Sequence, residues 1–120
     1  MANAFVHVEL HTGDTKAAKK FYSELFSSWK LEDMSMGDFD YTMVQVGEGT
    51  GGGMMKKPMP EAPSMWLAYI QVDNLASSTA QAEKLGGKLI QPITEVPEMG
   101  SFSIIADPDG AVFGLWEPKS

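Results

Sequence analysis

The chain has 120 residues, 43% of them hydrophobic and 21% charged, proportions that are ordinary for one globular domain. Its 16 acidic and nine basic residues give a net charge of −7, and every basic residue is Lys, which disfavours nucleic acid as a partner and a strongly anionic substrate. The absence of Cys excludes disulfides and thiolate metal sites, and no apolar run approaches the ~18 residues of a membrane span. With no charged-then-apolar leader before the first predicted strand, we expect no export signal, no membrane partner and a cytoplasmic location.

The first predicted strand, residues 5–11, alternates without a break. Successive strand side chains point to opposite faces, so Val6, Val8 and Leu10 form a core face. His7, Glu9 and His11 fall on the other face, and each of them can ligate a metal or move a proton. A solvated face would more usually carry Lys, Glu and Thr. We therefore expect this face to line a cavity.

A helix should follow from an N-cap at Asp14 or Thr15 to about Ser27, because apolar residues recur there at helical spacing. Its predicted buried stripe consists of Ala18, Phe21, Tyr22, Leu25 and Trp29. After the helix we expect a strand beginning at 29–32, a turn over 33–40, a strand at 41–46, a Gly-rich connection at 47–53, a short strand at 53–55 and a Pro-containing linker at 56–64.

The pattern then restarts, with a strand at 65–72, a helix at 75–85 ended by Gly86-Gly87, and strands at 88–92, 101–106 and 112–116. The two halves are offset by 60 residues, so that His7 corresponds to Leu67 and Glu9 to Tyr69. This repetition predicts an α+β fold of two β-α-β-β-β modules, at about 1–57 and 64–120. Neither half would bury enough apolar surface to be stable alone.

Several short motifs occur along the chain in an order that is typical of one protein family. They are His7 followed seven residues later by Asp14, the Phe21-Tyr22-x-x-Leu25-Phe26-x-x-Trp29 helix, Val72-Asp73-Asn74, Gly86-Gly87, and Asp107-Pro108-Asp109-Gly110 with Gly114-Leu115-Trp116-Glu117-Pro118. Together they resemble the vicinal oxygen chelate superfamily of glyoxalases, bleomycin-resistance proteins and extradiol dioxygenases. The resemblance implies a single glyoxalase-like domain over 1–120, whose curled eight-stranded sheet forms a cleft that contains the site.

The resemblance also implies where metal ligands would lie, namely at His7, at about Gly53, at Leu67 and at Gly114. Only His7 has a side chain that can donate an electron pair, whereas catalytic metal sites normally use three or more protein ligands. We therefore expect no cofactor. If a divalent metal is used, His7 is the residue that would hold it.

His7 and Glu9 are the candidate catalytic residues, as an acid–base pair acting next to a carbonyl. The alternatives are that His7 is a hydrogen-bonded pocket residue and that Glu9 forms an ion pair with His7 or a Lys. His11 lies near the end of the strand, and we expect it to be exposed.

The candidate ligand-binding residues are those expected to line the cleft: Leu67, Tyr69, Trp116, Met54, Met55, Gly53 and Gly114. Aromatic and Met side chains suit a small apolar or aromatic molecule, although simple core filling by Met and close strand packing at Gly remain alternatives. Two functions stay open. The first is a bleomycin-resistance-like binding protein without metal, and the second is a lyase or isomerase, similar to lactoylglutathione lyase, acting on a small carbonyl compound. We expect a homodimer in either case.

Overall fold

The structure is a computed structural model that describes residues 3–36 and 39–119. Along the chain the elements follow the order β-α-β-β-β twice, which confirms the predicted α+β fold of two modules. Contacts divide the chain into two compact units. The first unit is His7–Leu67, and the second contains Ala68 onward together with the N-terminal residues up to Val6.

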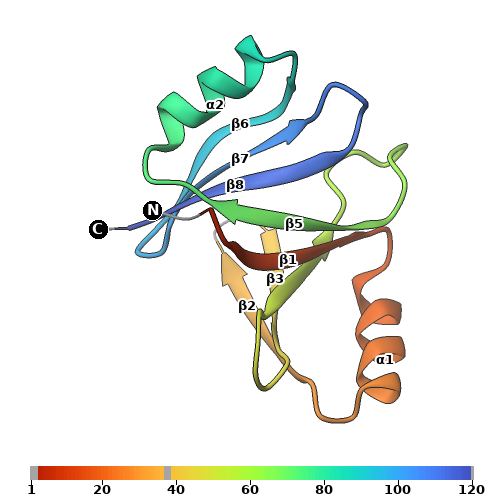
Figure 1. Cartoon of the computed structure of the whole chain (residues 1–120). Helices are drawn as coiled ribbons and strands as arrows, with labels where there is room; N and C mark the ends of the chain where they lie inside the picture. Colours follow the sequence, from red (N-terminus) through yellow and green to blue (C-terminus); the bar gives the residue numbers. More distant parts are fainter. Residues whose placement is uncertain (1–2, 37–38, 120) are drawn as a thin grey trace. The chain divides into compact units, whose positions relative to one another are not determined.

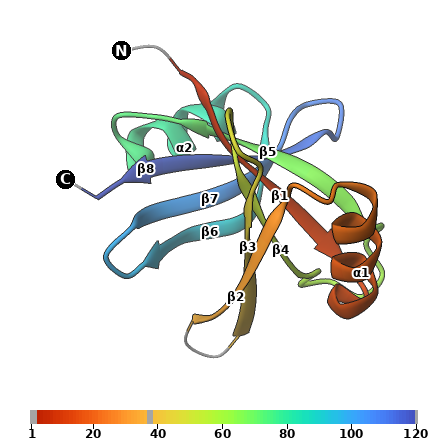
Figure 2. The same cartoon turned by 90° about the horizontal axis from the view of Figure 1, so that it is seen from below.

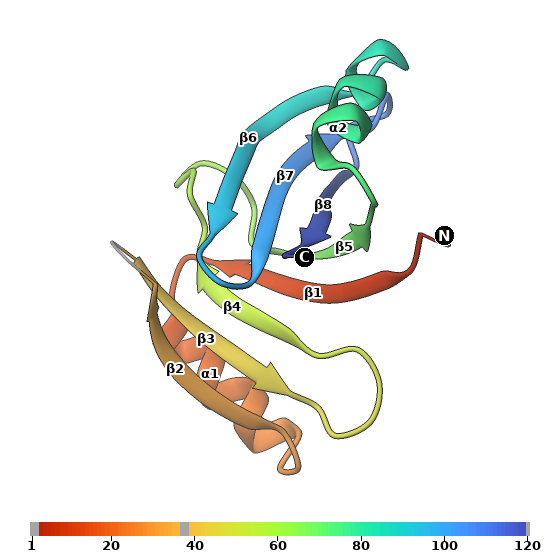
Figure 3. The ribbon, with the colours of Figure 1, turned by 90° about the vertical axis from the view of Figure 1, so that its left-hand side faces the viewer.

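The first unit contains most of β1 (Phe5–Thr12), then α1 (Thr15–Leu25), β2 (Lys30–Met36), β3 (Phe39–Gln45) and β4 (Gly52–Lys56). Its strands lie in the order β2-β3-β4-β1. The pairs β2–β3 and β3–β4 are antiparallel, and β4 pairs in parallel with β1, so that Glu9 lies opposite Gly53. Figure 3 shows α1 behind β2 and β3, on one face of these strands.

The core of the first unit lies on the face that α1 covers. Buried Leu10, Val44 and Met54 come from β1, β3 and β4, and Tyr22 of α1 and Trp29 pack against them. Burial of such side chains stabilises the folded chain by about 1.5–3 kcal/mol each. The core therefore fixes which strand residues face away from α1.

The predicted buried stripe of α1 is only partly correct. Tyr22 packs edge-on against Trp66 and stacks with Trp29, and its hydroxyl accepts a 3.1 Å hydrogen bond from Trp66 Nε1. In contrast, Phe21 is 60% exposed and Leu25 is 57% exposed. Helical spacing identified the apolar side of the helix, but the strands contact a narrower band of it than the pattern suggested.

The second unit contains the remainder of β5 (Met65–Gln71), then α2 (Leu75–Lys84), β6 (Lys88–Val96), β7 (Gly100–Ala106) and β8 (Val112–Pro118). Its strands lie in the order β5-β8-β7-β6 (Figure 1). Read from the first strand of its module, the first unit has the equivalent order, β1-β4-β3-β2. Figure 2 shows β6, β7 and β8 side by side. The backbone of Ala4 joins this unit by accepting a hydrogen bond from the Gln71 N–H at 2.9 Å.

The second core repeats the arrangement of the first. Val72, Leu75, Ile105 and Leu115 are buried, and Ala82 of α2 packs against them. On the same side, the Thr79 hydroxyl of α2 lies 2.9 Å from the hydroxyl of fully buried Ser103. Both helices thus cover one face of their own strands.

The predicted N-cap at Asp14 and the predicted helix end at Gly86 are confirmed. Asp14 and Asn74 cap α1 and α2 by accepting hydrogen bonds from the N–H groups of Ala17 and Ser77. Gly86 has a φ of +100° at the end of α2, a conformation that residues other than glycine rarely adopt. No helix in residues 3–36 and 39–119 has the length and apolar character needed to cross a membrane.

Two strand boundaries were predicted wrongly. Residues 33–36 belong to β2 and are not part of a turn, while the predicted turn residues Gly37 and Asp38 lie outside the described residues. The strand predicted at 88–92 continues through Pro92 to Val96. Pro92 is tolerated because β6 has only one partner in its unit and its pairing shifts register between Gln91 and Thr94.

Candidate functional site

Four polar side chains of the first unit form one hydrogen-bonded group, which we call the polar quartet: His7, Glu9, His11 and Tyr41. His7 Nε2 lies 2.7 Å from the Tyr41 hydroxyl oxygen, and that hydroxyl donates to Glu9 Oε1 at 2.8 Å. The other carboxylate oxygen, Glu9 Oε2, lies 2.6 Å from His11 Nε2. The three β1 residues share a face through strand alternation, opposite to Leu10 in the α1-covered core.

One expectation about these residues is wrong. His11 is buried, with 7% of its surface exposed. Its Nε2 contacts Glu9, two residues back along the strand, and the Tyr41 hydroxyl bonds to both His7 and Glu9. Side chains two apart on a strand lie on the same face, so spacing alone allows Glu9 to meet either histidine.

The direction of the Tyr41 hydrogen bonds defines the protonation of His7. Because the hydroxyl donates to Glu9, His7 must donate its Nε2–H to the Tyr41 oxygen. Burial lowers the pKa of His7 below its ordinary value of 6.5, and the negative charge of Glu9 only partly opposes this. A neutral imidazole carrying its proton on Nε2 is therefore the form expected at neutral pH.

Gly53 lies beneath the ring of Tyr41. A Cβ atom added to Gly53 would lie 1.9 Å from the Tyr41 hydroxyl oxygen and 2.2–2.3 Å from ring carbons, far inside contact distance. The neighbouring Met54 is fully buried in the α1-covered core, which agrees with the alternative of core filling. By alternation Met55, opposite His11 in the β1–β4 pairing, lies on the Gly53 face.

The other predicted ligand-binding residues lie on β5 and β8. Leu67 belongs to the first unit and is 2% exposed. In the second unit Tyr69 lies opposite Gly114, and its ring carbons would be 2.3–2.9 Å from a Cβ atom on that glycine. Phe102 packs edge-on against Tyr69 at 6.0 Å between ring centroids and lies opposite Trp116 in the β7–β8 pairing. Tyr69, Phe102 and Trp116 thus give the face opposite α2 an aromatic character.

Sequence reasoning missed Tyr41 and Phe102. A signal for Tyr41 was available, since it begins an alternating strand in which Tyr41, Met43 and Gln45 share one face. The sequence did not predict the pairing register of β3 and β4. In that register Met43 lies opposite Gly53, and Tyr41 is two residues before Met43 on β3. Only that register brings the ring over the glycine.

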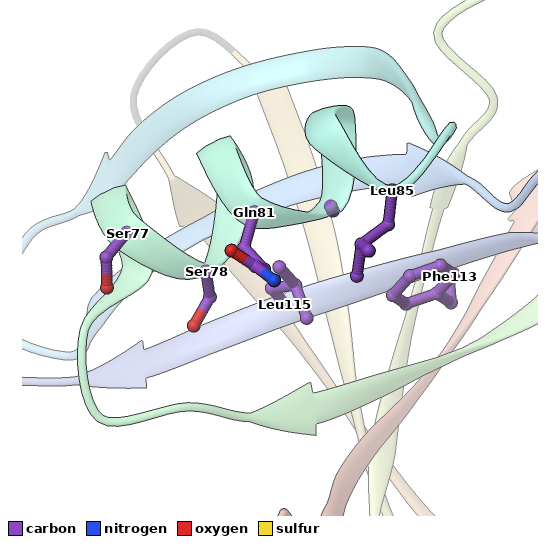
Figure 4. A pocket seen from close by; sticks show the side chains of 7 residues that line it. Ser77, Ser78, Gln81, Leu85, Phe113 and Leu115 are labelled. Atoms are coloured by element: carbon purple, nitrogen blue, oxygen red, sulfur yellow. The ribbon is translucent and has the colours of Figure 1, made fainter.

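A separate surface pocket of about 440 Å³ lies between α2 and β8 (Figure 4). Its lining residues are Ser77, Ser78, Gln81, Ala82, Leu85, Phe113 and Leu115. It contains none of the predicted site residues and no titratable group, and it is on the α2 side of β8, opposite to Gly114 and Trp116. The polar quartet, where buried ionisable groups converge, is therefore the stronger candidate site.

In the described parts of the chain, no three or more His, Cys, Asp or Glu side chains are placed so that they could hold a metal ion. The quartet has suitable donor types, namely two imidazoles and a carboxylate. These donors contact a hydroxyl or each other.

A family model described as the Glyoxalase/Bleomycin resistance protein/Dioxygenase superfamily matches residues 4–115. The chain belongs to this superfamily. Among curated members, CFP32 of Mycobacterium tuberculosis is 34% identical over 79 residues, which are 66% of this chain and 30% of CFP32. The chain thus spans less than a third of the length of that relative. The anthracycline biosynthesis protein DnrV of Streptomyces peucetius is 33% identical over 54 residues, 45% of this chain and 20% of DnrV.

The fold also matches that of solved structures. Methylmalonyl-CoA epimerase from Mycobacterium tuberculosis superposes with a TM-score of 0.72, covering 97% of this chain and 88% of the epimerase at 15% sequence identity. At that identity the likeness shows the shared fold alone, which is the glyoxalase-like arrangement of two β-α-β-β-β modules.

Proposed function

We propose that this superfamily member binds a small apolar or aromatic molecule at the face of the first unit that carries the polar quartet, and that it does so without a metal cofactor. The observation that carries the proposal is the position of the Tyr41 hydroxyl, 2.7 Å from His7 Nε2 and 2.8 Å from Glu9 Oε1. The groups best suited to coordinate an ion are instead hydrogen-bonded to a tyrosine.

The chemistry around the quartet supports an apolar or aromatic ligand. Tyr41 and Met55 belong to the same face of the first unit as Glu9 and His11. Such side chains, with a few placed polar groups, are the usual lining of small-molecule sites. The similarity to DnrV, named for anthracycline biosynthesis, makes a planar aromatic compound a suitable first probe.

The second candidate function is an enzyme of lyase or isomerase type that acts on a small carbonyl compound, with His7 and Glu9 as its acid–base pair. What favours it is the continuous path from His7 Nε2–H through the Tyr41 hydroxyl to Glu9 Oε1. A half-buried imidazole that is neutral at neutral pH can accept a proton, and the path links it to a carboxylate.

A thermal-shift measurement with a neutral dihydroxyanthraquinone tests the binding proposal. A ligand that binds only the folded protein raises the melting temperature according to its occupancy, so a rise that EDTA leaves unchanged is expected. Met55→Ala should reduce the rise, whereas Ser78→Ala, in the pocket beside α2, should leave it unchanged. No rise, or a rise that EDTA abolishes, would contradict the proposal.

Turnover of the hemithioacetal of methylglyoxal and glutathione tests the enzyme alternative. Activity that is retained in EDTA and lost in His7→Ala would favour catalysis by the quartet. Activity that is equal in wild type and His7→Ala would exclude it.

A homodimer, a cytoplasmic location and the absence of nucleic-acid partners are further parts of the proposal. The net charge of −7 disfavours phosphate backbones, and the lack of Cys suits a reducing compartment. Sedimentation equilibrium of the purified chain measures the oligomeric state directly, and a monomer at all concentrations would contradict the dimer.

A further inference from the structure

The side chain of Tyr41 fills the space that any side chain at position 53 would need. An added Cβ atom would meet the hydroxyl oxygen at 1.9 Å and two ring carbons at 2.2 and 2.3 Å. Real Cβ atoms do not approach other atoms this closely, so Tyr41 and a larger residue at position 53 exclude each other in this arrangement. Both residues are held by paired strands, since β3 and β4 are hydrogen-bonded neighbours.

The hydroxyl of Tyr41 also takes the point on which two potential metal donors converge. His7 Nε2 and Glu9 Oε1 both contact this oxygen, at 2.7 and 2.8 Å. An imidazole nitrogen and a carboxylate oxygen that face one point are the donor types of a divalent metal site. Here the point is occupied by a group that accepts one hydrogen bond and donates the other.

We propose that Tyr41 stands in place of the metal ion that this superfamily's metalloenzymes hold, and that Gly53 is a glycine because the tyrosine ring lies against it. The inference deepens the proposed function and rests on it, because it gives a physical reason for metal-free binding. Tyr41 is a specificity-determining residue in this account. A metal ion at this point would act as a Lewis acid and select ligands that chelate it through oxygen atoms. Tyr41 instead offers a ligand an aromatic ring and a hydroxyl group.

The second unit independently shows the same relationship. The ring of Tyr69 lies 2.3–2.9 Å from the place of a Cβ atom on Gly114, so a side chain at Gly114 is excluded as well. Here the tyrosine is directly opposite the glycine in the β5–β8 pairing, whereas Tyr41 comes from β3 and is two residues from the position opposite Gly53. Two different strand positions therefore lead to the same outcome, a tyrosine ring over a glycine of the last strand of a module.

The test restores the excluded ligand after removal of the tyrosine ring. Gly53→Glu combined with Tyr41→Ala adds a carboxylate directly across from Glu9 and removes the ring. Isothermal titration with Zn²⁺ should show one ion per chain, with an affinity on the order of 100-fold higher than that of wild type, because a further protein ligand is gained. Adding His7→Ala to this double variant should abolish the gain.

The matched control is Gly53→Leu combined with Tyr41→Ala. It removes the same ring and adds a side chain without a metal-donor atom, so we expect no gain in Zn²⁺ affinity. Equal gains in the two double variants, or no gain in a Tyr41→Ala/Gly53→Glu protein that circular dichroism shows to be folded, would overturn the proposal.

A measurement on the wild-type protein keeps the proposal testable if the double variants do not fold. Mn²⁺ broadens NMR signals of groups close to its binding site, and the ring signals of His7 should remain sharp in excess Mn²⁺. Selective broadening of His7 would overturn the substitution of metal by Tyr41. Failure of the proposed function is a separate result, since it would appear as the absence of an anthraquinone thermal shift.

Discussion

Tyr41 and Gly53 are a matched pair, because the tyrosine ring occupies the volume beside the glycine that a Cβ atom would need. Gly53→Ala should therefore destabilise the protein by about 1–3 kcal/mol, the usual cost of overpacking. In a Tyr41→Ala background the same substitution should cost much less, since the clashing ring is gone. Urea denaturation of the four proteins gives this coupling energy as a double-mutant cycle.

Gly13→Ala is the control for that cycle. A Cβ atom there would meet only Lys57 Cε at 3.6 Å, an ordinary contact, so its effect should be small and the same in both backgrounds. Additive effects of the Tyr41 and Gly53 substitutions would show that the two side chains do not compete for space.

Tyr41→Phe should destabilise the protein by about 1–2 kcal/mol, because it removes the hydroxyl that bonds to both His7 and Glu9 in a buried setting. Tyr22→Phe is the comparison, since the Tyr22 hydroxyl only accepts from Trp66 Nε1 in an exposed pair. A loss of about 0.5 kcal/mol or less is expected there. Equal losses in urea denaturation would contradict the central place of Tyr41 in the quartet.

Acid should destabilise the protein through His7. Burial places the pKa of His7 in the folded state below the ordinary 6.5, so the unfolded chain takes up the proton first as the pH falls. This contribution to stability is fully present above the unfolded pKa and is lost as the pH falls from about 6.5 toward the folded pKa. Its slope is at most about 1.4 kcal/mol per pH unit.

His7→Gln tests this pH dependence, because Gln keeps an N–H donor for Tyr41 and does not titrate. Thermal or urea denaturation between pH 7.5 and 5, as a range spanning the ordinary His pKa of about 6.5, should show a flatter profile for the variant. Parallel profiles of wild type and variant would assign the acid sensitivity to other groups.

The sequence was sufficient to predict the fold because its signals are local and repeated. Capping by Asp14 and Asn74, the glycine after α2 and the alternation of β1 each depend on a few neighbouring residues, and the two halves repeat their order. Alternation alone also placed His7, Glu9 and His11 on one face. The predicted end of β6 at Pro92 was wrong because pairing with β7 extends the strand to Val96. Pro is disfavoured within strands, so the local sequence indicated an end there.

The site could be predicted only in part, because it depends on contacts between distant strands. The partner of His7 is 34 residues away on β3, and no local pattern states which β3 residue will lie over Gly53. For Met54 and Met55 the sequence left core filling and a pocket role open, although alternation indicates that the two side chains lie on opposite faces. His11 is buried and contacts Glu9, a pairing that spacing allows but does not require.

The exposed side of α1 provides a last test, this one of packing. Leu25 is 57% exposed although it lies on the apolar side of the helix, so Leu25→Glu should change the unfolding free energy by about 0.5 kcal/mol or less. Leu10 is 5% exposed in the core that α1 covers, and Leu10→Ala should cost about 2–5 kcal/mol. Urea denaturation of both variants at low protein concentration measures this contrast. A large loss in Leu25→Glu would show that the side chain of Leu25 is buried in solution.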